Sequence, residues 1–319
     1  MVPRNGDSSV LEVRDVEVPD PGPCEVQVEV AAVGVNFIDV YQREGVYPIA
    51  TPFVSCSEGA GTVTAVGGGV AGVSVGDRVA WGQGLGSAAT TVNRSVDDLV
   101  PVPDGLDLDV AAAAMLQGMT AHYLVNSTYA VGPGTVALVH AAAGGVGQLL
   151  VQMVTAKGGR VIATAGSPQK LEIASRLGAA AVIDYSQTDD LAATVLAANG
   201  GAGVDVAYDG VGRATFDASL ASLRPRGMMV LFGASSGQVP PFDIQRLNRG
   251  GSLFLTRPTL GHYVATREEL LERAGSVLGD LAAGRLHLEV GGRHPLEKAA
   301  RAYDELEGRR TTGKLLIVP

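Results

Sequence analysis

The feature that most constrains the fold of this chain is a glycine-rich turn between an apolar, strand-like run and a helical pattern. The run is Thr135–His140, and it leads into Ala142-x-Gly144-x-x-Gly147. Dinucleotide-binding domains carry G-x-G-x-x-G at such a turn, and here alanine replaces the first glycine. Gly144 and Gly145 let the backbone approach a pyrophosphate, whose charge is stabilised by free N–H groups at the helix start. Because Gly147 also lets the helix pack close to the strand, the turn predicts a dinucleotide site.

The residues around this turn repeat the alternation of strand and helix. Six strand-like apolar runs are separated by helical patterns. The runs are Thr135–His140, Arg160–Ala165, Ala180–Ile183, Val204–Tyr208, Met228–Phe232 and Ser252–Thr256. Near-continuous apolar strands that alternate with helices are typical of parallel sheets covered on both faces. The predicted fold class is therefore α/β, with a doubly wound Rossmann sheet in the middle of the chain.

The sequence on either side of this region is typical of a different kind of domain. Between Cys24 and Trp81, short strands are broken by glycine and proline, and Glu25–Val33 alternates apolar and polar residues. This pattern favours an antiparallel, barrel-like β domain. The other expected elements are strands at Gly61–Val66, Asp77–Trp81, Leu286–Val290 and Lys314–Val318, and helices at Asp109–Val125, Thr266–Ala283 and Pro295–Leu306.

The end of the second strand of the Rossmann region indicates which dinucleotide is bound. An NAD site usually has an acidic residue there, about 20 residues after the glycine turn, which binds the ribose hydroxyls. Here Gly166 and Ser167 follow the strand without a carboxylate, and Lys170 comes in the next turn. A serine and a lysine can hold a phosphate by hydrogen bonds and charge, and Tyr185 follows the third strand. The sequence therefore predicts NADPH, with the alternative that Lys170 is an ordinary solvated helix residue.

Zinc ligands are scarce in this sequence. A zinc site needs three or four ligands from Cys, His and carboxylates. The chain has five histidines and two cysteines, and no histidine has metal-ligand spacing with Cys24 or Cys56. A site that includes Cys56 and Glu58, which lie close in sequence, is the alternative. We expect no bound metal and hydride chemistry that runs without one.

Composition and charge exclude several kinds of partner. The 319 residues are 46% hydrophobic and 18% charged, as in a globular protein, and the net charge of −9 argues against nucleic acid or an anionic membrane surface. No uncharged apolar run approaches the ~20 residues of a membrane helix. The first residues lack the apolar core of a signal peptide. Because two cysteines favour a reduced chain over a disulfide-bonded one, we expect a cytoplasmic protein.

A series of motifs in order adds a family to this interpretation. They are Gly34-Val-Asn-Phe-Ile-Asp-Val-Tyr, Glu44-Gly-Val-Tyr-Pro, Ser57-Glu-Gly-Ala-Gly, Gly76-Asp-Arg-Val, Gln117-Gly-Met-Thr-Ala, His140-Ala-Ala-Ala-Gly-Gly-Val-Gly, Phe232-Gly-Ala-Ser-Ser-Gly and Thr256-Arg-Pro. Over essentially its whole length the chain resembles the zinc-independent quinone oxidoreductase (zeta-crystallin-like) branch of the medium-chain dehydrogenase/reductases. The resemblance implies a GroES-like β-barrel catalytic domain at 1–118 and 258–319, around a Rossmann NADPH-binding domain at 119–257.

The resemblance also implies a homodimer and a complete first strand. Only Met1–Asn5 precede the turn that begins at Gly6, so we expect a first strand that is shortened or that starts further upstream.

Carried over residue by residue, the resemblance implies two sets of site residues. The cofactor contacts fall on Thr120, Gly145, Val146, Gly166, Ser167, Lys170, Tyr185, Phe232, Ser235 and Arg257. Asn36, Tyr41 and Tyr47 fall around the nicotinamide and the substrate. The zinc-binding cysteine and histidine of zinc-dependent relatives fall within Val35–Phe37 and on Ser57, which agrees with the scarcity of ligands.

The function implied is that of an NADPH:quinone oxidoreductase. Asn36 and Tyr41 offer neutral hydrogen-bond donors for negative charge that develops on the acceptor oxygen, and Tyr47 lines the pocket. The alternative for the tyrosines is that they only line a loop. An NADPH-dependent enoyl or 2-alkenal reductase acting on α,β-unsaturated carbonyls shares this scaffold and is the first alternative function. A non-catalytic, crystallin-like NADPH-binding protein is the second.

Overall fold

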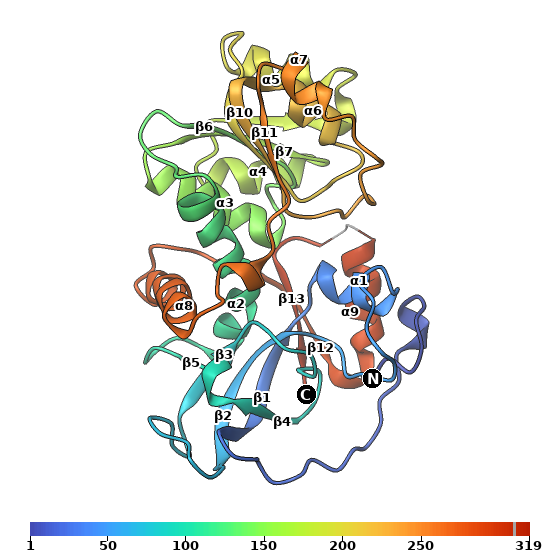
Figure 1. The fold of residues 1–319 in the computed structure, drawn as a ribbon, viewed down its shortest axis with the longest axis vertical. Helices are drawn as coiled ribbons and strands as arrows, with labels where there is room; N and C mark the ends of the chain where they lie inside the picture. The colour runs from blue at the N-terminus through green and yellow to red at the C-terminus, as the bar shows by residue number, and fades with distance from the viewer. Residues whose placement is uncertain (309–310) are drawn as a thin grey trace. The chain divides into compact units, whose positions relative to one another are not determined.

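The computed structural model describes residues 1–308 and 311–319, and the chain packs into two compact units (Figure 1). One unit contains both ends of the chain, Met1–Met119 and Tyr263–Pro319, and the other is the inserted segment Thr120–His262. The domain boundaries expected from the sequence, at 118/119 and 257/258, stay a prediction.

The inserted unit is built on a six-stranded sheet whose strand pairs are parallel. In spatial order the strands are β11 (Phe254–Thr256), β10 (Leu223–Leu231), β9 (Val204–Asp209), β6 (Val136–Val139), β7 (Arg160–Ala165) and β8 (Ala181–Asp184). The chain runs from β6 out to β8 and then returns to the other side of β6, so the strand order reverses between β6 and β9. Open α/β sheets bind ligands at the carboxyl ends of the strands beside such a reversal.

Five helices of the described chain belong to this unit. They are α3 (Gly145–Ala156), α4 (Pro168–Arg176), α5 (Leu191–Ala198), α6 (Phe216–Ala221) and α7 (Gln245–Arg249). Strand residues such as Leu138 and Ile162 form a core with Phe216 of α6. All six predicted strands are present, which confirms the α/β class. β10 starts earlier than predicted, because Leu223 already pairs with Val204 of β9. An irregularity in the register separates this pair from the regular pairing that starts at Met228.

The unit that contains the chain ends is built on a seven-stranded sheet. Its strands are β1 (Glu25–Gly34), β2 (Glu58–Val66), β3 (Arg78–Trp81), β4 (Thr91–Ser95), β5 (Val100–Pro101), β12 (Val290–Pro295) and β13 (Lys314–Val318). The pairings are antiparallel, as predicted, except that β12 and β13 are parallel. The strand predicted at Leu286–Val290 lies later in the chain, because pairing with β13 starts only where Val290 faces Lys314.

This unit has four α-helices in the described residues, and three of them were predicted from the sequence. They are α1 (Phe37–Arg43), α2 (Leu108–Tyr123, which runs across the division at Thr120), α8 (Arg267–Ala282) and α9 (Ala299–Glu307). Short 3-10 turns cover Ser8–Val10, Val96–Asp98 and Leu296–Lys298 in this unit. In the inserted unit, 3-10 turns cover Tyr185–Gln187 and Leu260–His262, and a π-helical turn covers Leu124–Thr128. α1 was not predicted. Val2 forms a single β-bridge with Phe53 at the start of the chain. In the described part of the chain, no helix has the length and apolarity to cross a membrane.

Candidate cofactor and catalytic site

The glycine turn leads directly from β6 into α3. Gly144 is the N-cap residue of the helix and has no side chain, so it leaves the N–H groups of the first turn uncapped. A Cβ on Gly147 would overlap the carbonyl oxygen of Ala141, so only glycine lets the helix lie this close to the turn. Ala141 itself adopts φ 49°. This geometry exposes amide groups at the positive end of a helix, which suits a bound pyrophosphate.

The end of β7 gathers four of the expected cofactor residues. Ser167 is the N-cap residue of α4, and its hydroxyl accepts a hydrogen bond from the backbone N–H of Lys170 at 3.4 Å. A Cβ on Gly166 would lie 2.5 Å from the hydroxyl of Tyr185, so Tyr185 packs over this glycine. A carboxylate is nearby, on Asp184, but it caps its own turn and accepts two hydrogen bonds from Ser186. The group therefore combines a lysine with hydroxyls, which are residue types that bind a phosphate.

A second group of expected cofactor residues lies after β10 and β11. A Cβ on Gly210 would lie 2.9 Å from the ring of Phe232, and the backbone N–H of Ser235 donates to the carbonyl of Gly210 at 3.2 Å. The guanidinium of Arg257 donates to the carbonyl of Leu231 at 2.9 Å. These residues lie at the carboxyl ends of the strands, where ligands bind in such sheets. Of the remaining expected contacts, Thr120 is buried on α2 and Val146 lies in the first turn of α3.

Two of the three expected catalytic residues form an aromatic pair at α1. The ring centroids of Tyr41 and Tyr47 are 5.4 Å apart with their planes at 72°, an edge-to-face arrangement. The backbone N–H of Tyr47 donates to the carbonyl of Tyr41 at 3.1 Å, and Phe37 lies 6.3 Å from the Tyr41 ring. Tyr47 is 36% exposed. The structure therefore packs the two rings against each other, with Tyr41 on α1 and Tyr47 in the segment that follows the helix.

The third expected catalytic residue, Asn36, lies in a buried polar cluster, which we call the Asn36 cluster. Its members are Asn36, Glu58, Gln117 and Lys314. The ammonium of Lys314 donates to Glu58 Oε1 and, at 2.6 Å, to Asn36 Oδ1. The other carboxylate oxygen of Glu58 accepts from the backbone N–H of Leu116 at 2.6 Å. The cluster therefore joins the end of β1, the start of β2, the helix α2 and the start of β13.

The side-chain amide of Asn36 uses its donors within this cluster. Asn36 Nδ2 donates to Glu58 Oε1 at 2.7 Å and to the carbonyl of Gly34 at 3.4 Å. Its Oδ1 accepts from Lys314 and, at 3.2 Å, from Gln117 Nε2. An amide nitrogen carries two N–H groups. In this geometry neither is left for a substrate oxygen, which differs from the donor role expected from the sequence.

A further buried carboxyl, that of Asp39, lies one helical turn after Asn36. Asp39 Oδ2 accepts from the backbone N–H of Asn36 at 2.7 Å, and the whole carboxyl is buried. Burial raises the pKa of Asp39 to about 7, against the opposing effects of the Asn36 N–H and of Lys314. The ionisation state of this side chain therefore changes near neutral pH.

The sequence predicted neither the Asn36 cluster nor the buried carboxyl beside it: Asp39 and Gln117 were given no role, Glu58 was considered only as a metal ligand beside Cys56, and no ion pair between Lys314 and Glu58 was expected. Each of Asp39, Glu58 and Gln117 belongs to a recognised motif, and Lys314 opens an apolar strand. A charged residue at the first position of a buried strand was the available signal. It could not be interpreted without knowing that β2 and β13 both flank β1.

No metal-ligating group is formed by the residues in ranges 1–308 and 311–319: no three His, Cys, Asp or Glu side chains meet. Cys56 and Glu58, the pair left open by the sequence, have other partners. The thiol of Cys56 lies 3.1 Å from the hydroxyl of Tyr303, and Glu58 is paired with Lys314.

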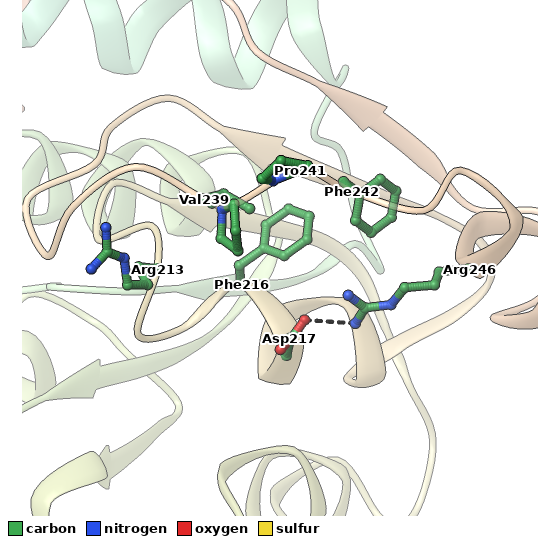
Figure 2. A pocket seen from close by; sticks show the side chains of 8 residues that line it. Arg213, Phe216, Asp217, Val239, Pro241, Phe242 and Arg246 are labelled. Atoms are coloured by element: carbon green, nitrogen blue, oxygen red, sulfur yellow. Dashed lines mark hydrogen bonds and ion pairs between the residues drawn. The ribbon is translucent and has the colours of Figure 1, made fainter. Parts of the chain in front are cut away.

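A pocket of about 200 Å³ lies in the inserted unit (Figure 2), and none of the expected site residues lines it. It is lined by Arg213, Phe216, Asp217, Val239, Pro240, Pro241, Phe242 and Arg246. Figure 2 shows the ion pair between Arg246 and Asp217, which measures 2.6 Å. Phe216 and Phe242, which both line the pocket, pack edge to face with their ring centroids 5.2 Å apart.

Two known families match this sequence. The family described as "Alcohol dehydrogenase GroES-like domain" matches residues 22–131, and the family described as "Zinc-binding dehydrogenase" matches residues 145–273. These correspond to the first part of the chain-end unit and to most of the inserted unit.

Full-length relatives and solved structures are also similar. A quinone oxidoreductase of Pseudomonas aeruginosa is 44% identical over 98% of this chain and 97% of its own. The 2-haloacrylate reductase of a Burkholderia species is 41% identical over 96% of this chain and 94% of its own. The crystal structure of an Escherichia coli quinone oxidoreductase complexed with NADPH is 40% identical, covers 99% of this chain and 98% of its own, and superposes with a TM-score of 0.96.

Proposed function

Because the chain belongs to the quinone oxidoreductase (zeta-crystallin-like) branch of the medium-chain dehydrogenase/reductase superfamily, we propose that it transfers a hydride from NADPH to a quinone. The observation that carries this proposal is the likeness to a quinone oxidoreductase, 44% identical over 98% of the chain. The order of strands and the glycine turn support it, because both belong to dinucleotide-binding sheets.

The residues of the inserted unit fit NADPH. The uncapped start of α3 at Gly144 and Gly145 suits the pyrophosphate, with Gly147 holding the helix close to the turn. Ser167 and Lys170 would hold the 2′-phosphate, since a carboxylate beside it would repel it and that of Asp184 is engaged by Ser186. The other residues proposed to contact the cofactor are Thr120, Val146, Gly166, Tyr185, Phe232, Ser235 and Arg257.

When bound, NADPH supplies the hydride. The protein then has to orient the acceptor and stabilise the charge that develops on its oxygen. We assign this donor role to Tyr41, with Tyr47 lining the acceptor pocket beside it. For Asn36 we propose a positioning role, because its N–H groups point to Glu58 and Gly34. Protons for the reduced quinone come from water, so no dedicated acid is required, and we propose that the transfer runs without a metal.

The proposal is tested by the oxidation of NADPH with a panel of acceptors. We expect turnover with 1,4-benzoquinone or 9,10-phenanthrenequinone by purified protein without stoichiometric zinc. Binding of NADPH without turnover of any acceptor would support a non-catalytic, crystallin-like role instead. A requirement for one zinc per chain would contradict the metal-free reaction.

A second candidate is the reduction of α,β-unsaturated carbonyls. It is favoured by the 2-haloacrylate reductase that is 41% identical over 96% of the chain. The same panel separates the two, because an enone or 2-haloacrylate turned over faster than every quinone would assign the chain to this class.

We also propose that the protein is a homodimer that pairs at β11. This strand forms one edge of the parallel sheet, and Phe254 and Leu255 on it are 57% and 36% exposed. Exposed apolar edge strands tend to pair with a second chain. The two cysteines are free, one of them at the surface, which suits the reducing cytoplasm as the proposed location.

A further inference from the structure

A fully desolvated ion pair lies at the centre of the Asn36 cluster. Lys314 is 1% exposed and Glu58 is not exposed at all, and their side chains are in direct contact. The cost of removing two charges from water can exceed the attraction between them, so a buried pair is weak support for stability. Its presence beside an expected catalytic residue suggests a role in the reaction.

The pair dictates which way the amide of Asn36 points. A lysine ammonium can only donate, so the atom of Asn36 that faces Lys314 at 2.6 Å has to be the oxygen. The nitrogen then faces Glu58 Oε1, a pure acceptor, at 2.7 Å. The reversed amide would oppose donor to donor and acceptor to acceptor. The orientation of Asn36 is therefore fixed by two buried charges of opposite sign.

Asn36 in turn fixes the start of α1, the helix that carries Tyr41. It is the N-cap residue of α1, and its backbone N–H donates to Asp39 Oδ2 while the N–H of Asp39 donates to the carbonyl of Asn36 at 3.1 Å. Tyr41 lies on the next turn of the same short helix, and Tyr47 is held to the Tyr41 carbonyl. A rotation at Asn36 would be passed on to both rings.

We propose that Lys314 and Glu58 are positioning residues for the reduction of the acceptor. They hold Asn36, and through it the first turn of α1, in the arrangement that presents Tyr41 and Tyr47 to the acceptor. This inference rests on the function proposed above. It requires that the kinetics of the acceptor depend on the pair even where the fold and the binding of NADPH do not.

The test uses a neutral double variant, Glu58→Gln with Lys314→Met, in the full chain. The side chains keep nearly the same volume, and the glutamine keeps an oxygen for the Leu116 N–H. Lys314→Met alone leaves Glu58 buried without its cation, so we expect its Tm to fall and the double variant to recover most of that loss. We expect the double variant to bind NADPH as the wild type does in a fluorescence titration. Its kcat/KM for the quinone should fall about ten- to a hundredfold, because the reacting groups are misplaced.

Asn36→Ala provides an independent test, since it removes the amide and leaves the ion pair in place. If the pair acts through Asn36, this variant loses a similar factor in kcat/KM, and combining it with the double variant produces no further loss. Effects that multiply would overturn the proposal, as would a double variant with the wild-type kcat/KM. If the double variant does not fold, an Asn36→Ala variant with the wild-type acceptor kinetics is enough to overturn it.

Glu307→Gln is the matched control, because Glu307 pairs with Arg43 at the other end of α1, at 2.8 Å. It should lower Tm slightly and leave the acceptor kinetics unchanged, whereas a loss equal to that of the double variant would show that any loosening of α1 suffices and would overturn the proposal. A wild type inert on every acceptor would instead contradict the proposed function, and this inference with it.

Discussion

At the scale of the residue, the buried carboxyl of Asp39 links stability to pH. Burial raises its pKa from 3.8 to about 7 in the folded chain. The folded state therefore binds this proton more tightly than the unfolded state does. As the pH rises from about 4 to about 7, the free energy of unfolding falls, because the unfolded chain releases the proton first. A difference of about three pH units corresponds to roughly 4 kcal/mol at ~1.36 kcal/mol per unit.

We predict that Asp39→Asn raises the stability of the protein at pH 8 and has a much smaller effect at pH 5. Asparagine keeps an oxygen for the Asn36 N–H but cannot ionise, so it avoids the cost of a buried charge. The measurement is urea unfolding of both proteins at the two pH values. Asp20→Asn, at an exposed side chain, controls for the change in net charge. A stability difference that is the same at both pH values would contradict the buried ionisation.

If Lys170 binds the 2′-phosphate as proposed, its charge decides, at the same scale, which nicotinamide cofactor is preferred. Hydrogen bonds to charged groups contribute about 1.5–3 kcal/mol, so Lys170→Ala should raise the KM for NADPH roughly 10- to 100-fold. The KM for NADH should change little, because NADH has no 2′-phosphate. Steady-state kinetics with both cofactors measure this, and equal changes would remove the phosphate assignment. Alanine favours helix, so α4 itself should not be disturbed.

At the scale of the element, the pairing of β1 with β2 requires a glycine at position 34. Gly34 is directly opposite Glu58, and a Cβ on Gly34 would overlap the Glu58 carboxylate. That carboxylate is the end of a flexible side chain, but it is held by Lys314, by Asn36 and by the Leu116 N–H. It therefore cannot move aside without breaking the Asn36 cluster.

We predict that Gly34→Ala destabilises the protein by about 3 kcal/mol, at the upper end of the cost of overpacking a core. Gly275→Ala on α8 is the matched control, because a Cβ there meets nothing within 4 Å. Alanine in a helix interior should stabilise it by about 0.5–1 kcal/mol. Chemical denaturation of both variants measures the contrast, and a neutral Gly34→Ala would show that Glu58 can relax.

The helices and strands also show which parts of the fold can be predicted from the sequence alone. The parallel strands were predictable because a strand buried on both faces is apolar along its length, as Val136–Val139 is. The glycine turn was predictable because it is local. α1 was not predicted, because its seven residues give too few turns for a periodicity to show. The parallel pairing of β12 with β13 depends on partners outside its own segment, which no local pattern encodes.

At the scale of the whole molecule, the same division separates the expected cofactor residues of the inserted unit from the Asn36 cluster of the chain-end unit. Most of the residues proposed to contact the cofactor follow strands of one parallel sheet, where topology rules place a ligand site. The Asn36 cluster draws Lys314 from the end of the chain to Glu58, which lies 256 residues earlier. The pairing of β13 with β1 brings these two residues together. The partners of a buried charge can therefore be identified only in the packed structure.

The exposed edge of the parallel sheet leads to a prediction about assembly. If a second copy covers β11, a charge placed there should separate the chains, because burying an unpaired ammonium against apolar residues is costly. We predict that the wild type sediments as a dimer and that Phe254→Lys, at a 57% exposed side chain, sediments as a monomer with little change in its unfolding. Val75→Lys is the control, since Val75 is 64% exposed in a turn of the other unit, and it should remain dimeric. A Phe254→Lys variant that stays dimeric would place the contact elsewhere, and a wild type that is monomeric at every concentration would rule out the dimer.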